Sequence, residues 1–159
     1  MEESIIDLFG EPKTPLNELS PLTLAFLGDA VHSLVAANVA VNRGNTAASK
    51  LHERTEKYVS ARAQARTAEY LLENRLLSDE EEAIYRRGVN AKPKNKAKNA
   101  TFTQYHKATG FEALLGYLYK LGQHERIAAL VYEGVRLIDG KDDPALSLQQ
   151  PDARETEII

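Results

Sequence analysis

The sequence of 159 residues contains no cysteine. This absence excludes disulfides, thiolate nucleophiles and cysteine-ligated zinc sites. A metal bound by this chain must be held by oxygen or imidazole ligands, and a carboxylate site favours magnesium or manganese. The chain also lacks a phosphate-cradling glycine motif, a dinucleotide fingerprint and the His-Glu-x-x-His spacing of zinc enzymes.

The N-terminal residues are acidic and lack the positively charged start of a signal peptide. One apolar stretch, residues 21–41, is long enough to consider as a membrane span. It is rich in alanine and carries Asp29 and His32, so we expect a core helix of a protein without a membrane partner. The predicted location is the cytoplasm.

The hydrophobic pattern indicates helices throughout, without a convincing alternating strand, so the predicted fold class is all-α. Helix starts are marked by Ser20-Pro21 and by a capping box that begins at Ser78, and Gly44 marks a helix end. We expect one domain over residues 1–140. Residues 141–159 are polar and contain proline, which predicts a poorly ordered tail.

Two isolated carboxylates are the most informative feature of the chain. Asp29 is the only charged residue between Glu18 and Arg43, and Glu112 lies in a second apolar run. Carboxylates are seldom buried without a compensating cation or hydrogen bonds. We therefore expect both to bind a divalent cation that activates water for attack on a phosphate. Alternatively, Asp29 hydrogen-bonds a neighbouring backbone group or His32, while Glu112 lies at a rim.

Each acid also has a glycine nearby within its predicted helix. Gly28 precedes Asp29, and Gly116 follows Glu112 by four residues. Glycine inside a helix costs roughly 0.5–1 kcal/mol relative to alanine, so each glycine should have a structural reason. A close approach of the two helices is such a reason, and it would bring the two acids together.

Positive charge is concentrated between the two acids, although the formal net charge of the chain is −3. No acidic residue occurs from Ala83 to Phe111, where a loop without hydrophobic periodicity follows a predicted helix. We expect this segment to contact phosphates of duplex RNA by shape, since no base-reading motif is present. The candidate RNA-binding residues are Arg86, Arg87, Asn90, Lys92, Lys94, Lys96 and Lys98. The alternative is a solvated loop whose charge offsets acids elsewhere.

Two motifs resemble those of a known family. Leu24-Ala25-Phe26-Leu27-Gly28-Asp29-Ala30 resembles the signature helix of the ribonuclease III catalytic domain, and Thr109-Gly110-Phe111-Glu112-Ala113-Leu114-Leu115-Gly116 resembles its second acidic motif. The sequence is most similar to the Mini-ribonuclease III branch, whose members consist of the catalytic domain without an appended double-stranded-RNA-binding domain. That resemblance extends over residues 16–137 and includes Val59-Ser60, Gln64 and the run from Arg87 to Lys92.

The chain departs from standard ribonuclease III at two acidic positions. Ala25 stands where a glutamate is expected and Thr109 where an aspartate is expected, so only Asp29 and Glu112 carry over as catalytic residues and metal ligands. This reduced set is typical of the Mini branch, and water and phosphate oxygens would complete the coordination of Mg2+.

The resemblance implies an all-helical homodimer whose Mg2+-dependent sites, with Mn2+ as a possible substitute, each cut one strand of double-stranded RNA and leave a 5′ phosphate. It further implies maturation of the ends of 23S ribosomal RNA precursor, with help from a ribosomal protein bound to the substrate. Ala25 and Thr109 keep a second hypothesis open, a catalytically silent RNA-binding or ribosome-assembly module. A third, a purely structural helical dimer, leaves the isolated acids unexplained.

Overall fold

A computed structural model describes residues 1–91 and 101–140, and within them every regular element is a helix, which confirms the predicted all-α fold. The helices are α1 (Glu2–Phe9), α2 (Pro21–Asn42), α3 (Ala48–Val59), α4 (Ala61–Glu73), α5 (Asp79–Val89), α6 (Thr101–Lys120) and α7 (His124–Asp139), with a short 3-10 helix, Leu16–Glu18, before α2. The predicted tail, residues 141–159, lies outside the described residues.

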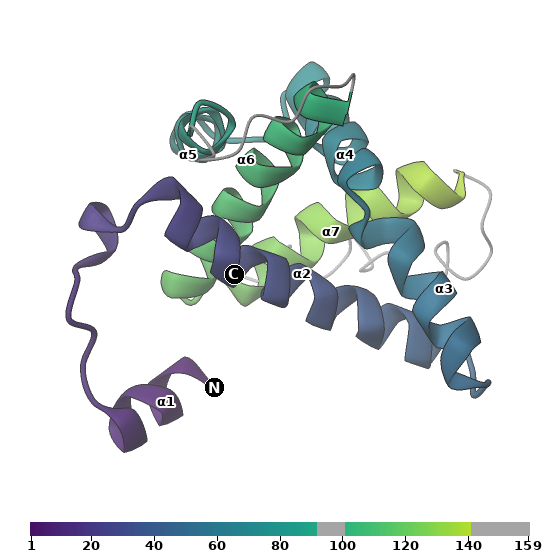
Figure 1. Ribbon diagram of the computed structural model, residues 1–159, viewed down its shortest axis with the longest axis horizontal. Coiled ribbons are helices and arrows are strands. Elements are labelled where there is room, and N and C mark those ends of the chain that lie inside the picture. Colours follow the sequence, from purple (N-terminus) through teal and green to yellow (C-terminus); the bar gives the residue numbers. More distant parts are fainter. Residues whose placement is uncertain (92–100, 141–159) are drawn as a thin grey trace, which may run out of the picture.

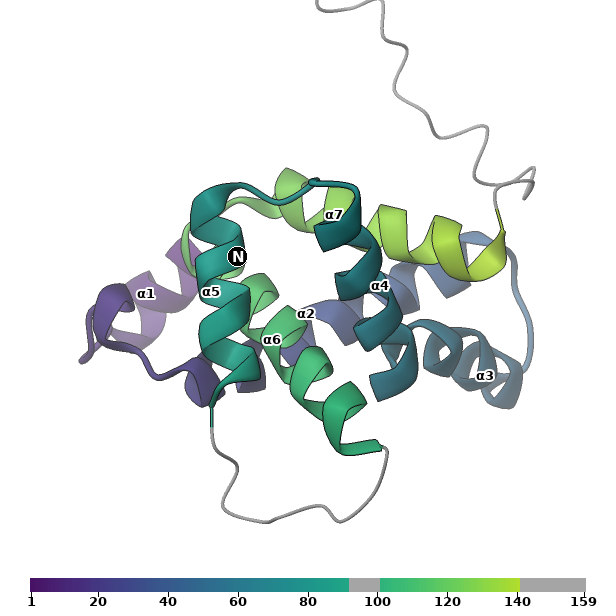
Figure 2. The ribbon, with the colours of Figure 1, turned by 90° about the horizontal axis from the view of Figure 1, so that it is seen from above.

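Helix α6 is the centre of the fold. It packs against α2, α5, α4 and α7, and its Phe111, Leu114, Leu115 and Leu118 are almost fully buried. Helix α2 runs across α6, while α5 and α4 lie on either side of it (Figures 1 and 2). The helix that carries Glu112 is therefore held by neighbours on several sides.

The predicted helix starts and the end at Gly44 are confirmed. The hydroxyl of Ser20 accepts a hydrogen bond of 3.1 Å from the Thr23 backbone N–H, and Ser78 and Glu81 form a complete capping box. These side chains satisfy backbone N–H groups that have no partner within the first helical turn. Helix α2 ends before Gly44, which has a positive φ of 121°.

Helix α2 is less buried than the sequence suggested. One face packs on α6 through Leu24, Ala25 and Gly28, whereas the opposite face exposes Leu22, Phe26, Leu34 and Val41. By length and composition α2 could cross a membrane, but it packs against α3, α5, α6 and α7 as a core helix does. Its exposed apolar stripe is of the kind that protein–protein contacts cover.

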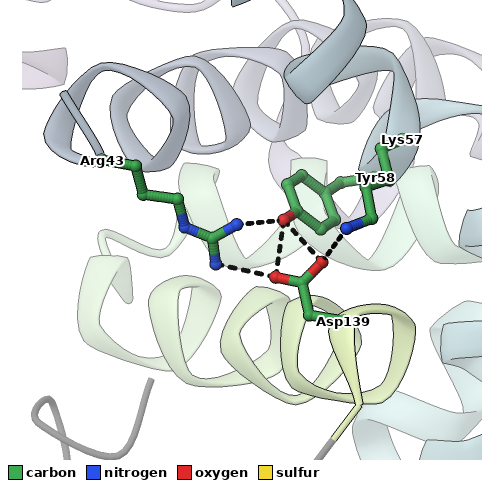
Figure 3. Close-up of polar contacts among 4 residues, drawn as sticks. All are labelled: Arg43, Lys57, Tyr58 and Asp139. Atoms are coloured by element: carbon green, nitrogen blue, oxygen red, sulfur yellow. Dashed lines mark hydrogen bonds and ion pairs between the residues drawn. The ribbon is translucent and has the colours of Figure 1, made fainter. Parts of the chain in front are cut away.

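The C-terminal ends of α2, α3 and α7 are joined by a polar cluster around Asp139 (Figure 3). The Asp139 carboxylate, only 3% exposed, pairs with Arg43 at 2.8 Å and with Lys57, and it accepts hydrogen bonds of 2.7 and 2.8 Å from the Tyr58 hydroxyl. Burial alone would raise the pKa of Asp139, but the hydrogen bonds from Lys57, Tyr58 and Arg43 lower it. The cluster fixes the end of α3 at Tyr58.

Candidate active site

The site is built on a close crossing of α2 and α6. A Cβ atom added to Gly28 would lie 1.7 Å from the Glu112 carbonyl oxygen, and one added to Gly116 would lie 2.0 Å from the Leu24 carbonyl oxygen. Neither contact is sterically possible, so only glycine allows the two backbones to approach this closely. The predicted close approach is confirmed, and it places Asp29 and Glu112 at the same crossing.

The two carboxylates differ in their surroundings. Asp29 is exposed, so the expectation that it would be buried was wrong, while Glu112 is half-buried. The pKa of Glu112 is raised to about 7, mainly by burial and in addition by the nearby charge of Asp29, while a hydrogen bond from Gln64 opposes the rise. Within residues 1–91 and 101–140, the Asp29 side chain makes no hydrogen bond to a backbone group or to His32. The alternative role of Asp29, as a hydrogen-bond partner of its neighbours, therefore has no support from the structure.

Gln64 of α4 holds one oxygen of Glu112. Its side chain is 2% exposed, and its Nε2 donates hydrogen bonds of 2.9 Å to Glu112 Oε1 and of 2.9 Å to the Val59 carbonyl oxygen. Sequence reasoning placed Gln64 in the family resemblance but gave it no role. A polar side chain between Ala63 and Ala65 on the apolar face of a predicted helix was the available signal.

The two positions where standard ribonuclease III carries further acids are buried and uncharged. Ala25 packs against Ala113, and the Thr109 hydroxyl donates a hydrogen bond of 3.0 Å to the Tyr105 carbonyl of its own helix. The described part of the chain contains no group of three or more histidine or acidic side chains that could hold a metal. Two carboxylates such as Asp29 and Glu112 are compatible in chemistry with a hard cation such as Mg2+, because that ion keeps several water ligands.

The predicted RNA-binding residues are only partly described. Arg86 forms an ion pair of 2.5 Å with Glu82, and Arg87 and Asn90 are exposed at the end of α5. This end packs on α6, because a Cβ atom on Gly88 would lie 2.7 Å from the Cα atom of Gly110. The structure thus joins the end of α5 to the helix that carries Glu112. The remaining candidates, Lys92, Lys94, Lys96 and Lys98, lie outside the described residues.

Comparisons with known proteins identify the family of the chain. A family model described as Ribonuclease III domain matches residues 22–123. A Mini-ribonuclease 3 of Streptococcus pneumoniae is 42% identical over 125 residues, which cover 79% of this chain and 98% of that protein. One of Thermoanaerobacter is 46% identical over 121 residues, covering 76% and 84% of the two chains. A crystal structure of a protein from Fusobacterium nucleatum has a TM-score of 0.65 and 26% identity, covering 79% and 97% of the two chains.

Proposed function

The chain belongs to the ribonuclease III family and is an endoribonuclease of that family, and we propose that it cleaves double-stranded RNA with a divalent cation held by Asp29 and Glu112. The observation that carries this proposal is the crossing at Gly28 and Gly116, which places two like-charged carboxylates together without a third acid nearby in the described residues. Mg2+ is the proposed ion and Mn2+ its substitute, because both prefer oxygen ligands.

The side chains of the site have separable tasks in this proposal. Gln64 engages Glu112 Oε1, so the other carboxylate oxygen is available to a cation. Asp29 is exposed, so a cation that it holds would also be accessible to an RNA phosphate. A divalent cation between the two acids would supply the positive charge that activates water and stabilises the phosphate in the transition state. Hydrolysis would leave a 5′ phosphate on the product.

The proposal is tested by cleavage of an end-labelled RNA duplex with Mg2+, with EDTA, and by the variants Asp29→Asn and Glu112→Gln. We expect cleavage by the wild type only with the metal, and duplex binding without cleavage by either variant. Glu73→Gln, an exposed acid at the end of α4, is the matched control and should cleave normally. Cleavage by Asp29→Asn at the wild-type rate would refute the assignment.

A second candidate function is an RNA-binding module without catalysis, which the uncharged Ala25 and Thr109 favour. It predicts duplex binding without cleavage by the wild type, even with Mn2+ and a stem taken from ribosomal RNA precursor. The same assay therefore separates the two functions.

RNA binding is assigned to the segment from Arg86 to Lys98, in addition to the carboxylate site. The proposed contacts are made by Arg86, Arg87, Asn90, Lys92, Lys94, Lys96 and Lys98. The stretch from Ala83 to Phe111 contains several arginines and lysines and no acidic residue, which supports this assignment because a polyanion is attracted to positive charge that no neighbouring acid in the sequence offsets.

We also propose that the protein is a homodimer that pairs through α2. Its exposed face includes Phe26, which is 84% exposed, in a helix whose other face forms part of the core. Met1, the residue before α1, is also exposed and lines the same pocket as Ala30 and Leu34 of α2. A second copy would cover the surface, and two sites would then be available for the two strands of an RNA duplex.

The proposed biological substrate is 23S ribosomal RNA precursor in the cytoplasm, presented with a bound ribosomal protein. Support comes from the resemblance to the Mini branch and from relatives named Mini-ribonuclease 3. Mapping of 23S RNA ends in cells that carry only the Asp29→Asn protein tests this role, because unprocessed ends should accumulate. Normal ends in those cells would refute the proposed substrate while leaving the enzymatic assay unaffected.

A further inference from the structure

We infer that Gln64 and His32 form a buried hydrogen-bonded pair that positions the Glu112 carboxylate for the cation. This inference rests on the proposed role of Glu112 as a metal ligand. Both residues act through Glu112, so they are positioning residues. Together they connect three elements of the fold, since His32 lies in α2, Gln64 in α4 and Glu112 in α6.

The orientation of the Gln64 amide is fixed by its partners. The Val59 carbonyl oxygen is always an acceptor, and Glu112 Oε1 is an acceptor without a proton to donate when Glu112 is ionised. Both must therefore face the NH2 group of Gln64. The amide oxygen must therefore point the other way. It is buried, and it has no hydrogen-bond partner of normal geometry among the described residues.

His32 supplies the missing donor. Its side chain is 3% exposed and packs edge-on against Phe111, with 5.5 Å between ring centroids, and its Nδ1 is likewise buried without a partner of normal geometry in the described part of the chain. Burial lowers the pKa of His32 to about 4, and a side-chain hydrogen bond with Gln64 opposes this shift. The neutral ring carries one N–H, and placing it on Nδ1 lets His32 donate to Gln64 Oε1, which satisfies both atoms.

The backbone acceptor of this arrangement is also fixed. Val59 directly follows Tyr58, whose hydroxyl is held by Asp139 and Arg43 at the end of α3 (Figure 3). Gln64 is thus held at its oxygen by His32 and at its nitrogen by the Val59 carbonyl. The second N–H is directed at Glu112 Oε1, so the rotation of the carboxylate is restricted before any cation binds.

The test is the affinity of the protein for Mn2+ alone, measured by electron paramagnetic resonance without RNA. Gln64→Leu keeps the volume but removes both N–H groups, and we expect its Mn2+ affinity to fall roughly 10–100-fold, as is typical when a group that orients a ligand is lost. His32→Phe keeps a ring against Phe111 but removes the donor, and a smaller loss is expected. The matched control is Thr67→Val, which removes a different buried polar group of α4, a hydroxyl whose hydrogen bond lies within its own helix.

A double variant distinguishes a coupled pair from two independent effects. If His32 acts through Gln64, His32→Phe should cause little further loss of Mn2+ affinity in the Gln64→Leu background. Duplex binding should be unchanged in all variants, and raised Mn2+ should restore the cleavage rate. Wild-type Mn2+ affinity of Gln64→Leu would overturn the inference, and additive losses would overturn the part played by His32.

Failure of the inference differs from failure of the proposed function. If Asp29→Asn is inactive while Gln64→Leu binds Mn2+ normally, only the positioning pair is refuted. If Asp29→Asn cleaves normally, the metal site itself is refuted. Should Gln64→Leu fail to fold, the Mn2+ affinity of His32→Phe tests the inference instead. An unchanged Mn2+ affinity of His32→Phe would contradict the proposal that His32 and Gln64 together position Glu112.

Discussion

Replacing Glu112 by glutamine should stabilise the metal-free protein at neutral and alkaline pH while abolishing cleavage. The pKa of Glu112 is raised in the folded state from 4.5 to about 7, first by burial and then by the charge of Asp29. A raised carboxyl pKa means that the folded state binds a proton that the unfolded state has already lost. This contribution to stability is complete below pH 4.5 and is lost as the pH rises to about 7.

The size of the effect follows from that difference in pKa. At about 1.36 kcal/mol per pKa unit, the ionised carboxylate lowers the free energy of unfolding by at most ~3 kcal/mol at alkaline pH. Because Glu112 is only half-buried, solvent screening reduces this figure, and about 1–3 kcal/mol is a reasonable range. For a chain of this size each kcal/mol shifts the melting temperature by about 2–4 °C.

The assay compares melting temperatures of the wild type, Glu112→Gln and Glu73→Gln in EDTA, from about pH 5 to about pH 8. His32 acts in the opposite sense. Its pKa is lowered from 6.5 to about 4 in the folded state, so its contribution to the free energy of unfolding is lost as the pH falls through that range. The difference between variant and wild type cancels this effect. This difference should grow with pH, and Mg2+ should raise the melting temperatures of the wild type and of Glu73→Gln but not that of Glu112→Gln. A difference independent of pH would refute the reasoning.

Four further predictions concern the crossing, the Asp139 cluster, the lysine segment and α2. Gly28→Ala should lower the free energy of unfolding in urea by roughly 3 kcal/mol and abolish duplex cleavage, because the added Cβ atom would overlap the Glu112 carbonyl. Asp139→Asn should lower the free energy of unfolding by about 2 kcal/mol at neutral pH, and by less in acid, where the carboxylate with the lowered pKa becomes protonated. Phe26→Asp should convert a dimer to a folded monomer in sedimentation equilibrium, and an intact dimer would exclude pairing through α2. Replacing Lys92, Lys94, Lys96 and Lys98 by alanine should make the plot of log binding constant against log salt concentration less steep, by about 0.7–0.9 per lost phosphate contact. An unchanged slope would contradict the proposed contacts of these lysines.

Local signals in the sequence predicted local structure correctly. The caps at Ser20 and Ser78 depend on hydrogen bonds within one helical turn, so a few neighbouring residues determine them. The glycines at 28 and 116 predicted the helix crossing, because a glycine inside an apolar helix often marks a point where another backbone comes close. The same signals could not predict which face of α2 is covered. The exposure of Asp29 depends on where α6 lies, and that information is not contained in α2.

Polar contacts between residues far apart in the chain could not be predicted from the sequence for the same reason. Gln64 and Glu112 are 48 residues apart, and Tyr58 and Asp139 are 81 residues apart. Each pair combines common residue types without a fixed spacing, so only the packing of the helices brings the partners together. The carboxylates could be recognised because they are unusual in their own helices, whereas Gln64, an uncharged amide on an alanine-rich face, gives a weaker signal and names no partner.

Destabilising features are concentrated at the crossing of α2 and α6. Gly28 and Gly116 lower the intrinsic stability of their helices, and Asp29 and Glu112 repel each other across the contact. The stabilising features lie elsewhere, in the capping box at Ser78 and in the Asp139 cluster at the ends of three helices. The close approach of the two backbones explains the glycines, whereas packing alone would favour an uncharged residue in place of Glu112, so we propose that a ligand compensates for the repulsion between the two acids. The proposed divalent cation would do so, and added metal should therefore raise the thermal stability of the wild type but not that of Glu112→Gln.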